Sequence, residues 1–140
     1  MDIVQDTNVF VAALRSQEGA SAAVLDRCLA LDDLAVMGAA LLAEYEELLQ
    51  RKSLWQGAVV TPAEREALLD DFCAAAVWHP VYFRWRPNLP DADDDHVLEL
   101  AIASGVEHLV THNIRDFARG EFKFTLPRVV TPAQHLKSVL

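Results

Sequence analysis

The chain has 140 residues, of which 52% are hydrophobic and 24% charged, and its formal net charge at pH 7 is −9. This length and balance predict one globular domain over residues 1–140 and exclude a largely disordered chain. The negative charge disfavours broad, nonspecific nucleic-acid binding, which needs a basic surface. No apolar run reaches the roughly 18 residues that span a membrane. The N-terminal residues lack a secretion-signal pattern, and both cysteines have apolar, helix-like surroundings, so we expect a cytoplasmic protein with reduced thiols.

Short apolar strands alternate with helices along the chain. Strands are expected at residues 3–4, 34–37, 79–83, 108–111 and 128–130. Helices are expected at residues 8–14, 20–31, 39–51 and 61–77, from the acidic cluster described below to about residue 104, and after residue 131. The strands are too short and too apolar for a two-faced antiparallel sheet. The sequence therefore predicts an α/β fold, a three-layer α/β/α sandwich around a mainly parallel sheet.

Carboxylates gather at the ends of buried elements. Four acidic residues in five positions, Asp91, Asp93, Asp94 and Asp95, stand just before the apolar stretch 97–103, and Asp6 ends the first strand. Such groups repel one another and lose solvation when buried, so a bound cation is the simplest reason to collect them. In parallel sheets, sites form beyond the carboxyl ends of strands, where the segment 111–113 also lies.

The amphipathic helix 39–51 adds a further acidic candidate. Its apolar side chains form one stripe at about 100° per residue, and Glu47 points away from that stripe. Glu44 and Glu46 lie on opposite borders of the stripe, where a carboxylate can face a cleft. Both remain candidates from the residues alone.

Competing metal and phosphate sites fit less well. An EF-hand calcium loop starting at Asp91 would need glycine and glutamate where the chain has His96 and Ile102. A metal-dependent phosphatase with an Asp-x-Asp motif would need an aspartate in place of Asn8. The histidines lack zinc spacing. Oxygen ligands of this kind suit Mg²⁺ or Mn²⁺, ions that assist phosphodiester hydrolysis by activating water and stabilising the leaving oxygen.

Several segments, taken in order and spacing, carry a family resemblance. They are Asp6-Thr7-Asn8-Val9, Leu41-Leu42-Ala43-Glu44-Tyr45, Trp85-Arg86-Pro87, the cluster 91–95, Leu98-Glu99-Leu100-Ala101 and the segment 109–117. Over nearly its whole length the chain resembles the PIN-domain ribonucleases, especially the VapC-like toxins of bacterial toxin–antitoxin pairs. The resemblance implies a Mg²⁺- or Mn²⁺-dependent endoribonuclease that cleaves RNA with a metal-activated water.

The resemblance also implies roles for individual residues. Asp6 matches the first metal ligand, Glu44 the helix glutamate, and either Asp94 or Asp95 the third acid. Asn8 and Thr111 match polar residues that orient ligands and water. Asn113 stands where many members have a fourth catalytic aspartate, and Asp116 is the candidate to replace that aspartate as a metal ligand.

The same resemblance also implies binding partners. Arg86, Arg115 and Arg119 are candidates to neutralise the RNA backbone, and we expect an antitoxin protein and a homodimer. Asn113 and the net charge also motivate an alternative, a catalytically degenerate PIN-like domain that binds RNA or a protein partner without cleavage.

Overall fold

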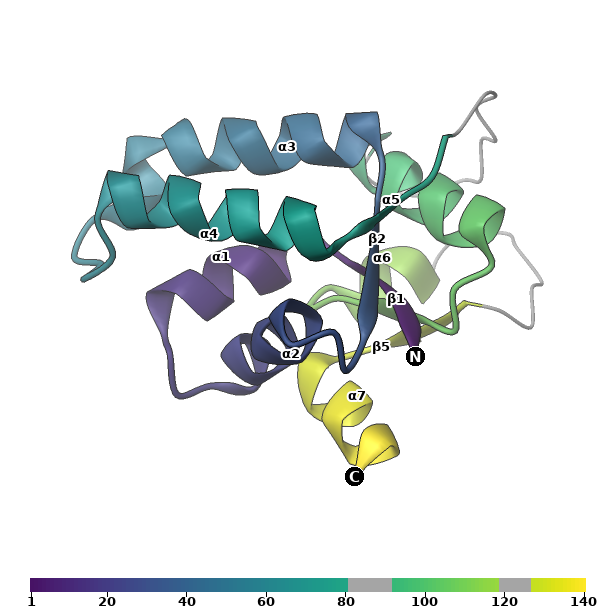
Figure 1. Cartoon of the computed structure of the whole chain (residues 1–140). Helices are drawn as coiled ribbons and strands as arrows, with labels where there is room; N and C mark the ends of the chain where they lie inside the picture. Colours follow the sequence, from purple (N-terminus) through teal and green to yellow (C-terminus); the bar gives the residue numbers. More distant parts are fainter. Residues whose placement is uncertain (81–91, 119–126) are drawn as a thin grey trace.

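The computed structural model of the 140-residue chain describes residues 1–80, 92–118 and 127–140, and in the second range the side chains of residues 96–117 (Figure 1). The predicted RNA-binding residues Arg86 and Arg119 therefore lie outside the described residues. The same holds for Asp91 and for the side chains of Asp94 and Asp95.

A five-stranded parallel sheet forms the centre of the described structure. Its strands stand in the order β3-β2-β1-β4-β5. Their bounds are β1 Asp2–Gln5, β2 Leu34–Met37, β3 Val77–Trp78, β4 His108–Val110 and β5 Arg128–Val130. Each neighbouring pair runs parallel, with Ile3 of β1 opposite Ala35 of β2 and His108 of β4. The predicted parallel sheet is confirmed.

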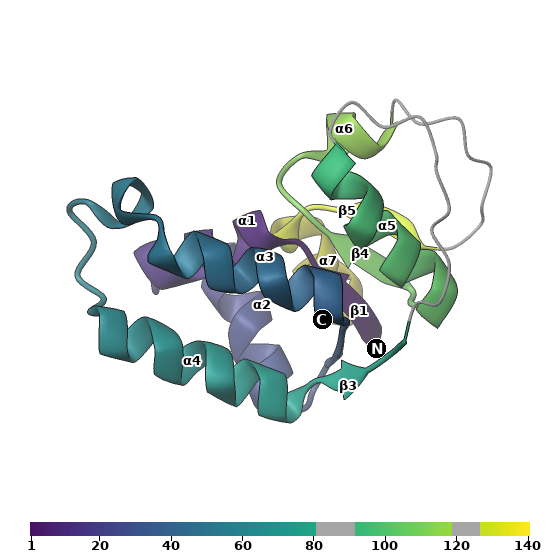
Figure 2. The same ribbon diagram turned by 90° about the horizontal axis from the view of Figure 1, so that it is seen from above.

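Helices cover both faces of this sheet. They are α1 Thr7–Arg15, α2 Ala20–Leu29, α3 Ala39–Gln50, α4 Pro62–Ala75, α5 Ala92–Ser104, α6 Ile114–Ala118 and α7 Pro132–Val139, with a 3₁₀ turn at Lys52–Trp55. Helix α5 packs on β1, β2 and β4, whereas α7 packs on β4 and on α2 (Figures 1 and 2). The three-layer α/β/α arrangement predicted from the sequence is therefore present. No helix in the described ranges combines the length and apolar character needed to cross a bilayer.

Local signals account for several helix ends. Thr61 and Thr131 each form a complete capping box, in which the hydroxyl accepts from the N3 amide and the N3 side chain accepts from the cap amide. Gly105 follows α5 with a φ of +68°, a left-handed conformation that glycine adopts without a Cβ clash. These ends match the predictions for the three helices.

Two parts of the prediction differ from the structure. The third strand is Val77–Trp78, paired with Val36 and Met37, whereas the sequence predicted residues 79–83. The expected positions 81–83 lie outside the described residues. Helix α6 was not predicted, because five residues are too few to show a helical period.

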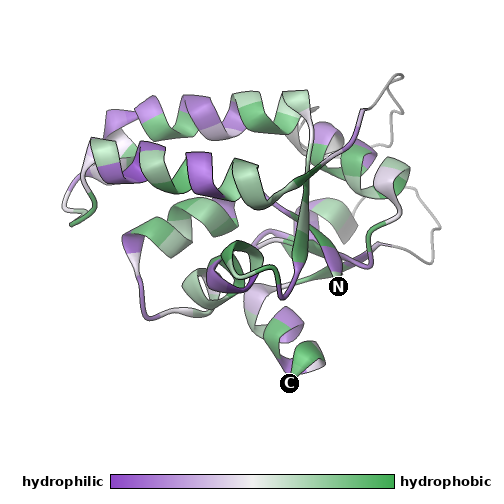
Figure 3. Ribbon diagram, in the orientation of Figure 1, coloured by the Kyte–Doolittle hydropathy of each residue, from purple (hydrophilic) through white to green (hydrophobic). Residues whose placement is uncertain are grey.

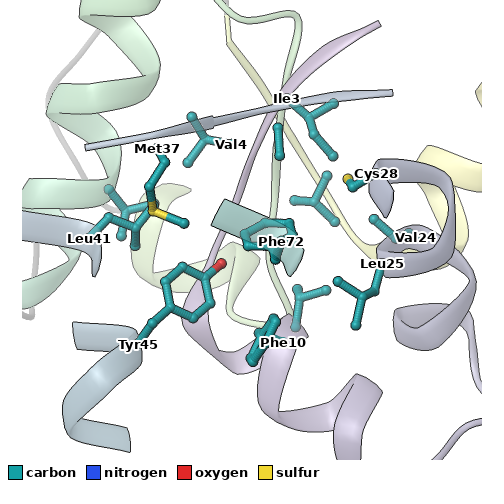
Figure 4. Close-up of a cluster of buried hydrophobic side chains, with 14 of the residues drawn as sticks. Ile3, Val4, Phe10, Val24, Leu25, Cys28, Met37, Leu41, Tyr45 and Phe72 are labelled. Atoms are coloured by element: carbon teal, nitrogen blue, oxygen red, sulfur yellow. The ribbon is translucent and has the colours of Figure 1, made fainter. Parts of the chain in front are cut away.

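The core joins the N-terminal helices to the sheet. Phe10, Tyr45 and Phe72 come from α1, α3 and α4, and their ring centroids lie 5.0–5.8 Å apart (Figure 4). The Tyr45 hydroxyl donates to the carbonyl of Gln5, which fixes α3 against β1. Apolar and polar residues alternate around the helices accordingly (Figure 3).

A buried polar group lies at the amino ends of the strands. The fully buried carboxylate of Asp33, just before β2, accepts from Arg27 Nε at 2.7 Å. His135 Nε2 of α7 lies 2.8 Å from the same carboxylate, and His135 Nδ1 lies 2.8 Å from His108 Nδ1 at the start of β4. We call Arg27, Asp33, His108 and His135 the Asp33 cluster. It links α2, α7 and two strands.

Candidate active site

Asp6 occupies the carboxyl end of the central strand β1. Its backbone amide donates to Val110 O at 2.9 Å, which continues the β1–β4 ladder, and Asp6 is also the N-cap of α1. The side chain is only 3% exposed, and its Oδ1 accepts from the amide of Thr7 at 2.8 Å. A carboxylate in this position is stabilised by the helix N-terminus.

Two polar side chains from neighbouring elements hold the other oxygen of Asp6. The hydroxyl of the buried Thr111, at the end of β4, donates to Asp6 Oδ2 at 2.8 Å. Asn8 Nδ2 of α1 lies 3.3 Å from Asp6 Oδ2 and 3.2 Å from Thr111 Oγ1. Thr111 Oγ1 in turn accepts from the amide of Asn113 at 3.0 Å. The structure thus brings together Asp6, Asn8 and Thr111, which lie up to 105 positions apart.

Glu44 lies in helix α3, directly before Tyr45, whose hydroxyl contacts the strand that ends at Asp6. Burial raises the pKa of the Tyr45 hydroxyl well above its ordinary value, and the nearby negative charge of Asp6 raises this pKa further, followed by smaller effects of Cys28, Cys73 and Glu44. Both carboxylates therefore act electrostatically on one hydroxyl, which is fixed on the Gln5 carbonyl directly before Asp6.

The competing residue Glu46 faces elsewhere. It lines an open groove of about 440 Å³ between α3 and α4, together with Glu66, Asp70 and the apolar Leu42 and Leu69. Glu44 is not among the residues that line this groove, so the two glutamates that the sequence left open have different surroundings.

The chemistry of the described donors fits a hard divalent cation. Asp6, Asn8 and Thr111 offer carboxylate, amide and hydroxyl oxygens, the ligand types that Mg²⁺ and Mn²⁺ prefer. Among the described side chains, no three His, Cys, Asp or Glu groups converge as a metal site. The third predicted acid, Asp94 or Asp95, lies in the first turn of α5, where side chains are outside the described set.

Beyond the end of β4, the residues up to helix α6 form a pocket whose lining residues His112 and Asn113 contact Asn8 and Thr111. It measures about 360 Å³, and we call it the His112 pocket. Its lining residues are His112, Asn113, Ile114, Arg115, Asp116 and Thr131. The predicted residues Asn113, Arg115 and Asp116 thus line one pocket, two to five residues beyond Thr111.

The position of His112 was not anticipated from the sequence, which predicted surface or packing roles for the histidines. Its Nε2 lies 2.7 Å from Oγ of Ser21, a buried residue of α2, and its backbone amide donates to Asn8 Oδ1 at 3.1 Å. A serine within an alanine-rich helix carries no local signal of such a contact, so only the tertiary structure reveals it.

Comparisons with known proteins agree with this architecture. A family model described as PIN domain matches residues 2–115. No curated protein matches the chain. Among solved structures, the chain is similar to one in the crystal structure of VapBC2 from Rickettsia felis bound to a DNA fragment from their promoter. The TM-score is 0.61 and the identity 17%, over 94% of this chain and 98% of that one.

Proposed function

Because this chain belongs to the PIN-domain family, we propose that it is a Mg²⁺- or Mn²⁺-dependent endoribonuclease and the toxin of a toxin–antitoxin pair. The observation that carries the proposal is the buried Asp6 carboxylate, held at a strand end by Thr111, Asn8 and the first turn of α1. Burying a charged carboxylate costs free energy. A carboxylate that is nevertheless buried and held by three hydrogen-bonding partners is therefore a candidate for a functional role.

The residues of the proposed site have distinct roles. Asp6, Glu44 and either Asp94 or Asp95 hold the ion, and Asn113 supplies a neutral amide where a further carboxylate would otherwise stand. When bound, the ion supplies Lewis-acid activation of water and stabilises the charge on the leaving oxygen. Thr111 and Asn8 keep the Asp6 carboxylate in one orientation, so that little reorganisation is needed when a substrate phosphate arrives.

Substrate binding requires local positive charge on an acidic protein. The exposed Arg115 lies beside the Asp6 site, and we propose that it neutralises a backbone phosphate together with Arg86 and Arg119. With a net charge of −9, binding should depend on these few contacts and weaken as salt concentration rises.

The partner is proposed from the fold. The Rickettsia felis structure is described as VapBC2 bound to promoter DNA, which supports an antitoxin protein as the partner of this chain. We further propose a homodimer and a cytoplasmic location, both from the resemblance to VapC-like toxins.

The central test is cleavage of total RNA by the purified chain with Mn²⁺, with EDTA and after Asp6→Asn. Asparagine has nearly the same shape and can still cap α1, so a loss of cleavage would reflect the lost charge. Asp2→Asn, at the exposed opposite end of β1, is the matched control and should cleave like the wild type. Cleavage that survives both EDTA and Asp6→Asn would refute the mechanism.

One observation favours a second function, binding without cleavage. Asn113 contributes no charge at a position where many members of the family have a fourth aspartate, and the net charge of −9 fits a basic protein partner. This alternative predicts no Mn²⁺ binding by calorimetry at millimolar concentration, alongside measurable binding of RNA or a protein partner.

A further inference from the structure

The His112 pocket is an open, partly polar depression on the surface, large enough for a flat aromatic base. Its volume of about 360 Å³ lies within the range of about 300–1,000 Å³ found for ligand pockets. Within the described residues, neither Arg115 nor Asp116 forms an ion pair. Their charges are therefore available to a ligand.

The imidazole of His112 is held in place although the residue is exposed. The Ser21 hydroxyl fixes Nε2 from α2, and Asn8 fixes the backbone amide from α1. Contacts from α1 and α2, together with the end of β4, therefore hold the imidazole at the pocket before any ligand binds. Such preorganisation removes part of the side-chain entropy that binding would otherwise cost.

The side chains that line the pocket carry both positive and negative charge, and this combination favours a nucleobase over a phosphate as the ligand. A phosphate subsite would need cations alone, and the Asp116 carboxylate would repel the anion. An unpaired base, in contrast, offers a ring face for the imidazole or the guanidinium and an edge with both donors and acceptors. Asp116 supplies acceptors and Asn113 supplies both donors and acceptors, while the guanidinium of Arg115 is left for the backbone phosphate of the same strand.

The pocket is directly joined to the Asp6 site. Asn8 contacts both Asp6 and His112, while Thr111 donates to Asp6 and accepts from Asn113. The two sites therefore share Asn8 and Thr111 as common residues, so that neighbouring parts of one strand could contact both.

We propose that the His112 pocket binds an unpaired nucleobase adjacent to the scissile phosphate and prefers guanine. Guanine presents two adjacent N–H donors, at N1 and the 2-amino group, that match the two oxygens of Asp116. Adenine and cytosine offer only an amino group on that edge. The proposal rests on the proposed nuclease function for its biological meaning, but it concerns binding and can be tested without cleavage.

The experiment measures fluorescence anisotropy of full-length Asp6→Asn protein with labelled single-stranded oligouridine and with the same oligomer carrying one guanosine, adenosine or cytidine. One bidentate contact should make the guanosine oligomer bind about tenfold more tightly. Adding Asp116→Asn should abolish this preference, whereas Asp71→Asn, an exposed residue of α4, should retain it. Ser21→Ala should weaken binding of all oligomers similarly, because it frees the imidazole.

Three outcomes would overturn the proposal. They are equal affinity for all four oligomers, no binding of any oligomer, and a guanosine preference that survives Asp116→Asn. A separate calorimetric titration of Asp116→Asn in the wild-type background distinguishes the base role from the metal role, because loss of a metal ligand would lower Mn²⁺ affinity far more than loss of a nearby charge. A base preference in a chain that never cleaves RNA would leave this inference standing and refute the nuclease. Cleavage without a preference would do the reverse.

Discussion

Replacing Asp33 by asparagine should destabilise the fold, because the Asp33 cluster joins four elements through one buried charge. The carboxylate receives Arg27 Nε at 2.7 Å and His135 Nε2 at 2.8 Å, and the amino group of Met1 lies 3.5 Å away. Hydrogen bonds to charged groups contribute roughly 1.5–3 kcal/mol each. Asparagine keeps the shape and one acceptor, so we expect a loss of about 3 kcal/mol at pH 7.5.

The assay is chemical denaturation followed by circular dichroism, with the slope of the transition compared between variants. For a domain of this size, about 3 kcal/mol corresponds to a melting point lower by roughly 10 °C. Asp32→Asn is the matched control, since the neighbouring Asp32 is exposed and should change the free energy of unfolding by less than about 0.5 kcal/mol. Equal effects of the two substitutions would refute the assigned role of the cluster.

The pH dependence of this difference has a definite sign. Burial opposes ionisation of Asp33, but the hydrogen bonds from Arg27 and His135 outweigh it, so the pKa lies below the ordinary 3.8. A carboxylate with a lowered folded-state pKa stabilises the protein above its unfolded pKa and loses that contribution as pH falls. The gap between wild type and Asp33→Asn should therefore stay constant down to about pH 4 and shrink below 3.8. A gap that is constant down to pH 2 would contradict the assignment.

His108 should add an acid-sensitive step at higher pH. Burial lowers its pKa below the ordinary 6.5, and the nearby His135 and Arg128 lower it further, against the opposite effects of Glu107 and Asp33. Below 6.5 the unfolded chain takes up a proton that folded His108 resists, so stability falls as pH decreases. In His108→Asn, whose amide can still donate near the Nδ1 position, this step should be absent from the unfolding free energy measured between pH 7.5 and 5.

Three further substitutions have expected directions. Thr111→Val should reduce RNA cleavage by about tenfold or more through a lower kcat, because Asp6 loses a fixed donor, and Thr111→Ser should restore it; cleavage by the valine variant at the wild-type rate would contradict this. Leu31→Gly should raise the free energy of unfolding by about 0.5–1 kcal/mol, since Leu31 has a φ of +65° and is 59% exposed, whereas Leu31→Ala should give no such gain. Tyr45→Phe should lower the free energy of unfolding by about 1–2 kcal/mol, because the hydrogen bond to the Gln5 carbonyl is lost. An unchanged melting point would show that this hydrogen bond is not stabilising.

Local patterns in the sequence were sufficient for much of the fold. Apolar runs located β1, β2, β4 and β5, and both capping boxes formed as the residues predicted. The missed strand was β3, because a two-residue edge strand is defined by pairing with Val36 and Met37 and not by its own composition. Its side chains Val77 and Trp78 are exposed and give no alternating pattern.

The candidate site was partly accessible for a topological reason. In a parallel sheet the residues after neighbouring strands meet at one edge, which brings Asp6 to Thr111 across 105 positions. The same rule says nothing of helix side chains that reach this edge from the side, and Ser21 contacts His112 in that way.

Strand β4 has a polar residue at each end, and each of these residues belongs to a different hydrogen-bonded group. His108 begins the strand in the Asp33 cluster, which anchors α7 and α2, and Thr111 follows its other end in contact with Asp6. Only the apolar Leu109 and Val110 separate these two groups, and both are fully buried. Both ends of this short strand are therefore tied to other elements by side-chain hydrogen bonds. The Asp33 cluster thus anchors the amino end of the strand whose carboxyl end presents Thr111 to Asp6.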